Sequence, residues 1–397
     1  MDSLLKYLIE NGKINLPEII NEMERKSEDN YIKQHRYNIW QGKNGKWYTY
    51  LPDEKKGRVQ RERNSEDEIK KIIISYYKER EVNPTIKEVF YTWLGRKISN
   101  NEIEESTYTR YEVDFLRCFE NFGERKIKNV TAIDIEDFLK SCVHEKNMSR
   151  KAYSNIRTLM NGMFKYAKKA GYVTYDIKDV ISNIDFSRKE FTSVIHEDIE
   201  QVFFASEEAD ITEYMKNNID TINLGLLLLF ASGMRIGELC ALKPSDIDGN
   251  IVKIRRCETM YKDRVTGERV YEIKDRPKTD AGIRDIIITD DNLWIIRKLK
   301  NLNPFGEFLL QENGERIKSY VFRNRLYLNC KKVNAVRKSP HKIRKTYGSK
   351  IYDSNIEESI ICGQMGHTDI SCLKKHYYYN RLNKQEKTEK LNMVAKL

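Results

Sequence analysis

The spacing of hydrophobic residues divides the first 80 residues into helix, sheet and helix. Residues 1–32 carry apolar side chains at helical intervals and predict a short N-terminal helical extension. From His35 to Arg63 aromatic and β-branched residues recur with a period near two, which predicts a three-stranded sheet. Ser65, followed three residues later by Glu68, is a capping box that predicts a helix running to about Arg80.

After Pro84 the hydrophobic pattern is helical to about Asp185. The most regular helix is predicted from about Ser149 to Ala170. One side of it is apolar and predicts core contacts, through Ile156, Leu159, Met160, Met163, Phe164 and Ala167. The opposite side is basic, with Arg157, Lys165 and Lys168. That side either lies along a phosphate backbone or is simply solvated.

The last part of the chain combines a buried helix with strands. Leu224 to Ala231 is apolar throughout, which predicts a buried helix. Arg235 follows directly, and an arginine beside a buried segment needs either an ionic partner such as Glu238 or a ligand. Residues 250–288 alternate as strands do, and they predict three strands with Lys278 at a hairpin turn between the second and the third.

Composition narrows the class of protein. The chain has 397 residues, 40% of them hydrophobic, which suffices for two or three domain cores. Its net charge of +11 favours a nucleic acid over an acidic or neutral partner. The seven cysteines are scattered without a CxxC pair, so neither a disulfide framework nor a zinc site is expected. No apolar run approaches the roughly 18 residues of a membrane span, and we expect a soluble, cytoplasmic protein without membrane contact.

Basic residues are concentrated in two stretches. From Arg316 to Lys350 there are twelve Lys or Arg and no Asp or Glu, a pattern that indicates a polyanionic partner. Between Lys33 and Arg63 nine Lys or Arg stand against three Asp or Glu. One side of the predicted sheet is therefore either a DNA-binding surface or a solvated basic face.

Candidate catalytic groups gather between Ser339 and Asn380. His341 and Arg344, three residues apart, share one side of a predicted helix. His367 follows a glycine, and Tyr377 begins a run of three tyrosines. A nucleophile, a cationic clamp and proton-transfer partners are what phosphodiester chemistry without a metal requires. The alternative is a basic solvated surface that happens to include a histidine.

These motifs, in this order, resemble the tyrosine recombinase (phage integrase) family, and the conjugative-transposon and phage integrases in particular. The family pairs an HxxR box with a later Gly-His and with a tyrosine nine or ten residues beyond that histidine. It also carries an earlier arginine in a Gly-x-Arg-x-x-Glu setting and a lysine in a β-hairpin. The matching positions are Arg235, Lys278, His341, Arg344, His367 and Tyr377. His376 is nine residues after His367 and Tyr377 is ten, so Tyr377 is preferred over Tyr378 and Tyr379.

The resemblance implies a multidomain, mainly α protein with small β-sheets. After the extension of residues 1–32, we expect an α/β arm-type DNA-binding domain at 33–83. A helical, SAM-like core-binding domain is expected at 84–185, and an α+β catalytic domain with a C-terminal tail at 186–397. The last two domains would close around duplex DNA as a clamp.

The implied activity is that of a site-specific DNA recombinase of a mobile element, which integrates and excises DNA through a 3′-phosphotyrosine. Tyr377 is expected to attack the phosphate, Arg235 and Arg344 to hold its non-bridging oxygens, and Lys278 to protonate the leaving oxygen. His341 would assist proton removal from the tyrosine. His367 would donate a hydrogen bond to the phosphate. Neither a cofactor nor a metal is expected.

The expected partners are double-stranded DNA, at core and arm-type sites, and further copies of the chain, which would form a tetramer in synapsis. A directionality factor is left open. Three other activities are alternatives. A type IB topoisomerase would relax DNA without recombining it, and a non-catalytic DNA-binding regulator would need a broken motif. A metal-dependent nuclease would need converging carboxylates near the basic stretch.

Overall fold

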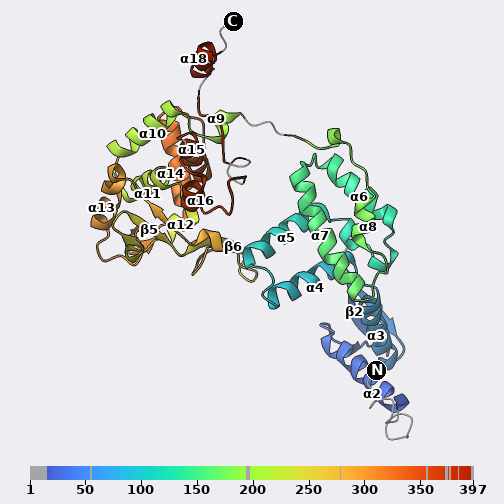
Figure 1. Cartoon of the computed structure of the whole chain (residues 1–397). Helices are drawn as coiled ribbons and strands as arrows, with labels where there is room; N and C mark the ends of the chain where they lie inside the picture. The colour runs from blue at the N-terminus through green and yellow to red at the C-terminus, as the bar shows by residue number, and fades with distance from the viewer. Residues whose placement is uncertain are drawn as a thin grey trace. The chain divides into compact units, whose positions relative to one another are not determined.

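The computed structural model describes residues 16–53, 56–193, 197–277, 279–354, 356–371, 374, 377–382 and 384–394. The chain forms two compact units, Met1–Ser193 and Val194–Leu397, and both are drawn in Figure 1. Within the described residues, no helix has the length and apolar composition that crossing a membrane requires.

The first unit begins with the predicted small sheet between two helices. In chain order these elements are α2 (Leu16–Gln34), β1 (Trp40–Gln41), β2 (Trp47–Asp53), β3 (Gly57–Arg63) and α3 (Glu66–Val82). The three strands are antiparallel in the order β1-β2-β3. A small core of Leu51, Ile69 and Ile73 joins the sheet to α3. The part of the predicted N-terminal extension before Leu16 lies outside the described residues.

The start of α3 differs in one detail from the predicted capping box. Ser65 caps the helix by accepting a hydrogen bond from the backbone N–H of Glu68. The Glu68 carboxylate, however, accepts from the N–H of Asn64, at 3.2 Å, instead of returning to Ser65. The reciprocal bond has therefore moved by one residue, although the helix begins where the sequence predicts.

The rest of the first unit is helical, as expected. Its helices are α4 (Ile86–Ser99), α5 (Glu105–Cys118), α6 (Ala132–Glu145), α7 (Arg150–Lys169) and α8 (Ile177–Ser182). Ser149 caps α7 by accepting from the N–H of Ala152. All six residues of the apolar stripe predicted on this helix are buried in the core, and Arg157, Lys165 and Lys168 are exposed on its other side.

The second unit is built around a helix that is buried on all sides. That helix, α11 (Thr221–Ser232), packs against α10, α13, α14 and α15. It ends at Gly233, whose φ of 64° is a left-handed conformation that favours glycine. The other helices of the unit are α9 (Asp198–Gln201), α10 (Ala205–Asn217), α12 (Ile236–Cys240), α13 (Leu293–Leu302), α14 (Ser319–Lys332), α15 (Pro340–Asp353), α16 (Glu358–Met365) and α18 (Lys384–Val394).

The strands of the second unit pair differently from the prediction. They are β4 (Ile247–Asp248), β5 (Ile251–Ile254), β6 (Cys257–Lys262), β7 (Arg269–Lys274), β8 (Arg284–Ile287), β9 (Gln311–Glu312) and β10 (Glu315–Arg316). β4, β5 and β8 form one sheet, while β6 and β7 form a separate ribbon. The prediction of a hairpin at Lys278 is therefore wrong. The segment after β7 crosses from the ribbon to the sheet, because β8 pairs with β5.

Candidate active site

Tyr377 lies among three other candidate residues. They are His341 and Arg344 of α15 and His367 of the Gly-His corner. The centroid of its ring is 4.7 Å from that of His367 and 5.4 Å from that of His341. The guanidinium carbon of Arg344 is 5.3 Å from the ring centroid. The structure thus brings together Tyr377, the HxxR box and the second histidine, the candidate residues that the sequence suggested.

The next two tyrosines turn to other surroundings. Tyr378 packs on Tyr352, with ring centroids 4.8 Å apart, and Tyr379 accepts a hydrogen bond of 2.9 Å from Nζ of Lys345. Ser349, fully buried in α15, fixes this segment: its hydroxyl donates to the carbonyl of Tyr377 and accepts from the N–H of Tyr379. The helix that carries the HxxR box therefore also holds the backbone of the tyrosines.

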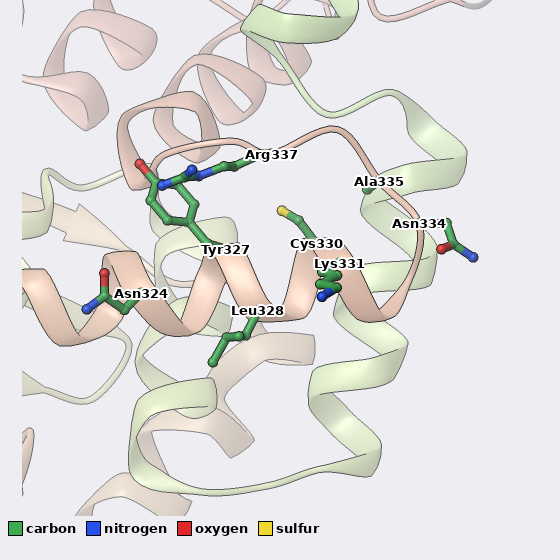
Figure 2. A pocket seen from close by; sticks show the side chains of 8 residues that line it. All are labelled: Asn324, Tyr327, Leu328, Cys330, Lys331, Asn334, Ala335 and Arg337. Carbon is green, nitrogen blue, oxygen red and sulfur yellow. The ribbon is translucent and has the colours of Figure 1, made fainter.

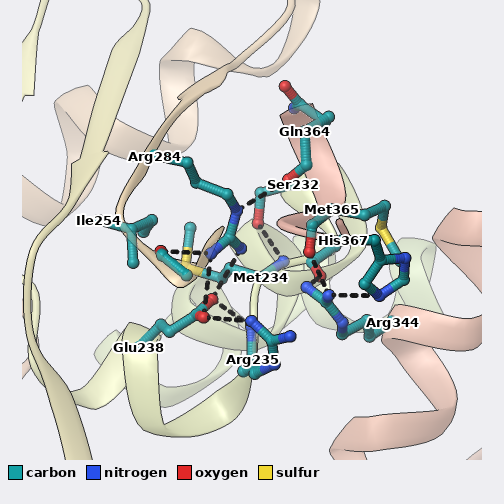
Figure 3. A network of polar contacts seen from close by, with 12 residues as sticks. Ser232, Met234, Arg235, Glu238, Ile254, Arg284, Arg344, Gln364, Met365 and His367 are labelled. Carbon is teal, nitrogen blue, oxygen red and sulfur yellow. Dashed lines mark hydrogen bonds and ion pairs between the residues drawn. The ribbon is translucent and has the colours of Figure 1, made fainter. Parts of the chain in front are cut away.

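Arg344 is buried, with 1% of its surface exposed, and joins three segments. Its guanidinium donates to the carbonyl of Gly233, at 2.8 Å, and to the carbonyl of Met365. The same group lies 3.2 Å from Nε2 of His367, as Figure 3 shows. Because guanidinium nitrogens only donate, Nε2 of His367 is the acceptor and the ring is neutral, with its proton on Nδ1.

Two buried polar atoms at this site have no hydrogen-bond partner in the described part of the chain. They are Nε of Arg344 and Nδ1 of His367. Buried donors are nearly always satisfied, and an unsatisfied one is costly. Both atoms are N–H donors, so the group that would satisfy them is an acceptor, such as an anionic oxygen.

Both histidines are held in the neutral form. Burial and then the charge of Arg344 lower the pKa of His367 to about 4. His341 is exposed at the surface, but neighbouring protein atoms crowd its ring and partly desolvate it, and Lys345 and Arg344 add positive charge beside it. Crowding and these cations together lower the pKa of His341 to about 4. A neutral imidazole at neutral pH is able to accept a proton.

Arg235 caps α12 and is held by Glu238. Its guanidinium donates to Oε1 of Glu238 at 2.8 Å, and its backbone N–H donates to Oε2 at the same distance. Arg235 keeps 37% of its side chain exposed, whereas Glu238 keeps 1%. Glu238 is therefore the ionic partner that the sequence offered as one alternative for Arg235.

The sequence did not indicate the second partner of Glu238, which is Arg284. This buried arginine donates to both carboxylate oxygens, at 3.0 and 2.8 Å (Figure 3). Burial would raise the pKa of Glu238, but the hydrogen bonds and charge of Arg284, with the charge of Arg235, hold it at about 2. One signal was available: Arg284 takes the inward position in the alternation with Ile286 and Ile288.

Lys278, the proposed general acid, lies outside the described residues, as does His376. The neighbours of Lys278 are described: Pro277 is buried, and a short 3₁₀ turn follows at Asp280–Gly282. Across the described parts of the chain, no group of three or more His, Cys, Asp or Glu side chains could hold a metal ion.

One hollow of the second unit lies apart from the candidate catalytic residues. It runs along α14, has a volume of about 700 Å³ and is lined by residues such as Tyr327, Lys331 and Arg337 (Figure 2). Its lining includes neither a carboxylate nor a histidine. None of the candidate catalytic residues lines this hollow.

Comparison with known families finds a match in each of the two units. The phage integrase family matches residues 194–386, and the phage integrase N-terminal SAM-like domain matches residues 85–142. The chain belongs to the tyrosine recombinase (phage integrase) family. The resemblance drawn from the catalytic motifs is therefore confirmed.

Relatives within the tyrosine recombinases are distant but extensive. A tyrosine recombinase XerC-like protein of Caldanaerobacter subterraneus subsp. tengcongensis is 24% identical over 323 residues, which are 74% of this chain and 78% of the relative. A probable integrase/recombinase of Acholeplasma phage L2 is 23% identical, over 67% of this chain and 84% of the relative.

Solved structures support the fold. The Tn1549 transposon integrase in complex with transposon right end DNA aligns with a TM-score of 0.59 and 17% identity, over 79% of this chain and all of that one. A lambda integrase dimer bound to a COC′ core site aligns with a TM-score of 0.52 and 16% identity, over 87% of this chain and 97% of that one. The predicted mainly helical fold with small sheets is confirmed.

Proposed function

We propose that this recombinase cuts and rejoins duplex DNA at specific sites of a mobile element, through a covalent bond between Tyr377 and a 3′-phosphate. The observation that carries the proposal is the position of Tyr377. Of the three consecutive tyrosines, it is the one whose ring contacts His341, Arg344 and His367. Tyr378 and Tyr379 are engaged by Tyr352 and Lys345.

A DNA phosphate would satisfy the donors that the protein leaves unpaired. Nε of Arg344 and Nδ1 of His367 would each donate to a non-bridging oxygen. Arg235, whose side chain is partly exposed, would supply the second guanidinium. Donors fixed before the substrate arrives stabilise the charge of a pentavalent transition state without having to reorganise. This supports a reaction that needs no metal.

The proposed step transfers the phosphoryl group from one oxygen to another. The Tyr377 hydroxyl oxygen bonds to phosphorus, and the bond between phosphorus and the 5′ oxygen breaks. The tyrosine proton passes to neutral His341, and the leaving 5′ oxygen takes a proton from Lys278. The energy of the phosphodiester is kept in the phosphotyrosine, so a second strand's 5′-hydroxyl can reverse the step and complete the exchange.

In this proposal each part of the chain has its own task. Residues 33–83 would bind arm-type DNA, residues 84–185 core-site DNA, and residues 186–397 would carry the chemistry. Lambda integrase has been solved as a tetramer bound to a Holliday junction, and we propose a tetramer in synapsis for this chain also. A directionality factor and a cytoplasmic location remain predictions.

The test is covalent capture. The protein is incubated with a duplex taken from the flanks of its own coding sequence, in excess chelator, and protease-sensitive protein–DNA adduct is measured. We expect adduct from the wild type and none from Tyr377→Phe, which should bind the duplex as well as the wild type does. Tyr378→Phe and Tyr379→Phe are the matched controls and should form adduct.

Three outcomes would contradict the proposal. Adduct from Tyr377→Phe, with its loss in one of the control variants, would move the nucleophile. Loss of wild-type cleavage on chelation, with binding retained, would revive a metal-dependent nuclease. Relaxation of supercoiled DNA without exchange of strands between two duplexes would favour the topoisomerase alternative.

A further inference from the structure

Arg284 lies where three segments that carry proposed catalytic residues meet. It is the first residue of β8 and is buried, with 5% of its side chain exposed. All three of its guanidinium nitrogens donate hydrogen bonds, and the acceptors belong to Glu238, Gly282 and Gln364. In sequence, Glu238 lies three residues after Arg235, Gly282 four residues after Lys278, and Gln364 three residues before His367.

The first connection fixes Arg235. Oε1 of Glu238 accepts from Arg235 at 2.8 Å and from Arg284 at 3.0 Å. Oε2 accepts from the backbone N–H of Arg235 and from Arg284, each at 2.8 Å. Each carboxylate oxygen is thus shared between the two arginines. The orientation of Glu238, and through it that of Arg235, depends on the guanidinium of Arg284.

The second connection closes the base of the loop that carries Lys278. Arg284 donates to the carbonyl of Gly282 at 3.0 Å. Gly282 lies directly on buried Pro277, since a Cβ added to the glycine would be 2.5 Å from Cβ of the proline. Pro277, before Lys278, and Gly282, after it, are therefore held together, and Arg284 anchors Gly282.

The third connection fixes the Gly-His corner. Nε of Arg284 donates to the carbonyl of Gln364 at 3.0 Å. At Gly366, where φ is +62°, an added Cβ would be 2.9 Å from Cδ of Arg284 and 2.8 Å from the carbonyl oxygen of Ala281. The loop after Lys278 and the corner before His367 thus pack against each other at Arg284.

We propose that Arg284 is a positioning residue that sets the mutual placement of Arg235, of Pro277 and Gly282 beside Lys278, and of His367 around the scissile phosphate. This role rests on the proposed function, because that function gives Arg235, Lys278 and His367 their tasks. Arg284 itself is assigned no contact with DNA. A buried fork of donors suits this role, since its planar geometry fixes several acceptors at once. A lysine of similar charge would hold fewer of them.

The experiment compares Arg284→Met and Arg284→Lys with the wild type in single-turnover cleavage and in duplex binding. We expect both variants to bind the flanking duplex within about 3-fold of the wild type and to cleave it about 100-fold more slowly, because displacement by an ångström costs about that much in rate. Arg256→Met is the matched control. It breaks another largely buried pair, in which Arg256 donates to both oxygens of Asp246 at 2.6 and 2.5 Å.

Two further measurements separate positioning from stability. Arg284→Met combined with Glu238→Gln removes both buried charges, so it should recover unfolding stability without recovering cleavage. A duplex with sulfur in place of the 5′ bridging oxygen has a leaving group that needs no proton, because thiols are far more acidic than alcohols. On that duplex the deficit of Arg284→Met should shrink, since the contribution of the Lys278 loop is bypassed.

Three outcomes would overturn the role of Arg284. They are cleavage by Arg284→Met within about 3-fold of the wild type, recovery of cleavage in the double variant, and an equal deficit on the oxygen and sulfur duplexes. A wild-type protein that forms no adduct on either duplex would instead refute the proposed function. The two failures are therefore distinguishable.

Discussion

An arginine lies over a tyrosine in two very different regions of this recombinase. On the outer face of the N-terminal sheet, the guanidinium carbon of Arg58 is 4.3 Å from the ring centroid of Tyr50, and Arg58 is exposed. At the candidate active site Arg344 lies 5.3 Å from the ring of Tyr377 and is 1% exposed. The same pair of residue types is solvated in one place and enclosed in the other.

The difference in exposure indicates which task each region suits. An exposed cation–π contact is worth about 0.5–1 kcal/mol, so Arg58 is free to leave its ring and follow a phosphate. Arg344 is tied by hydrogen bonds to the carbonyls of Gly233 and Met365, so its remaining donors point in a fixed direction. The first arrangement favours adaptable DNA binding, and the second favours stabilisation of a transition state.

The largest effect is expected from Arg344→Lys. A lysine keeps the charge but not the planar fork, so we expect single-turnover cleavage to fall by about 100- to 1,000-fold, as removal of a fixed transition-state donor does. Arg337→Lys is the control, because Arg337 lies 3.8 Å from the ring of Tyr327 in the same unit but is exposed. If Arg344→Lys slowed cleavage by less than about 10-fold, Arg344 would not act as a fixed donor, and its contrast with Arg58 would be refuted.

An intermediate effect is expected from pH. With its pKa lowered to about 4, His341 stays neutral as pH falls from 7 to 5, and cleavage should persist over that range. Lys345→Met removes one of the cations that lower this pKa, so the acid loss of cleavage should begin at higher pH. Lys350→Met, on the same helix but exposed and paired with Glu208, should not move the profile. An unmoved profile in Lys345→Met would exclude His341 as the proton acceptor.

Much of the helical framework could be predicted, because burial follows a simple period. The stripe on α7 was predicted residue by residue, the helix begins close to Ser149 as expected, and α11 was evident from its unbroken apolar run. The HxxR residues follow from helix geometry, since positions three apart share one side. In each case a local rule and the tertiary structure agree.

Two features, the pairing of the strands in the second unit and the burial of Arg284, could not be predicted because the sequence pattern does not say which segments meet in the fold. β6 was not predicted, and the partners of β7 and β8 were misassigned, since alternation marks strands without naming their neighbours. Arg284 escaped for a similar reason. An arginine in an alternating strand normally faces solvent, and only the arrival of Glu238 and Gln364 from other segments makes its burial favourable.

The smallest effect is expected on the N-terminal sheet, and it tests which face meets DNA. Arg58 and Arg61 are both exposed cations of β3, but they project from opposite faces because side chains alternate along a strand. Arg61 stands opposite Thr49, which is fully buried on the face covered by α3, whereas Arg58 shares the outer face with Tyr50. A covered face cannot enter a DNA groove.

Arg58→Ala should therefore weaken binding of the flanking duplex several-fold and reduce the slope of log affinity against log salt by about 0.9, the contribution of one phosphate. Arg61→Ala should leave the affinity and the slope unchanged. A larger slope change in Arg61→Ala than in Arg58→Ala would show that the outer face, which carries Tyr50, is not the DNA-binding one.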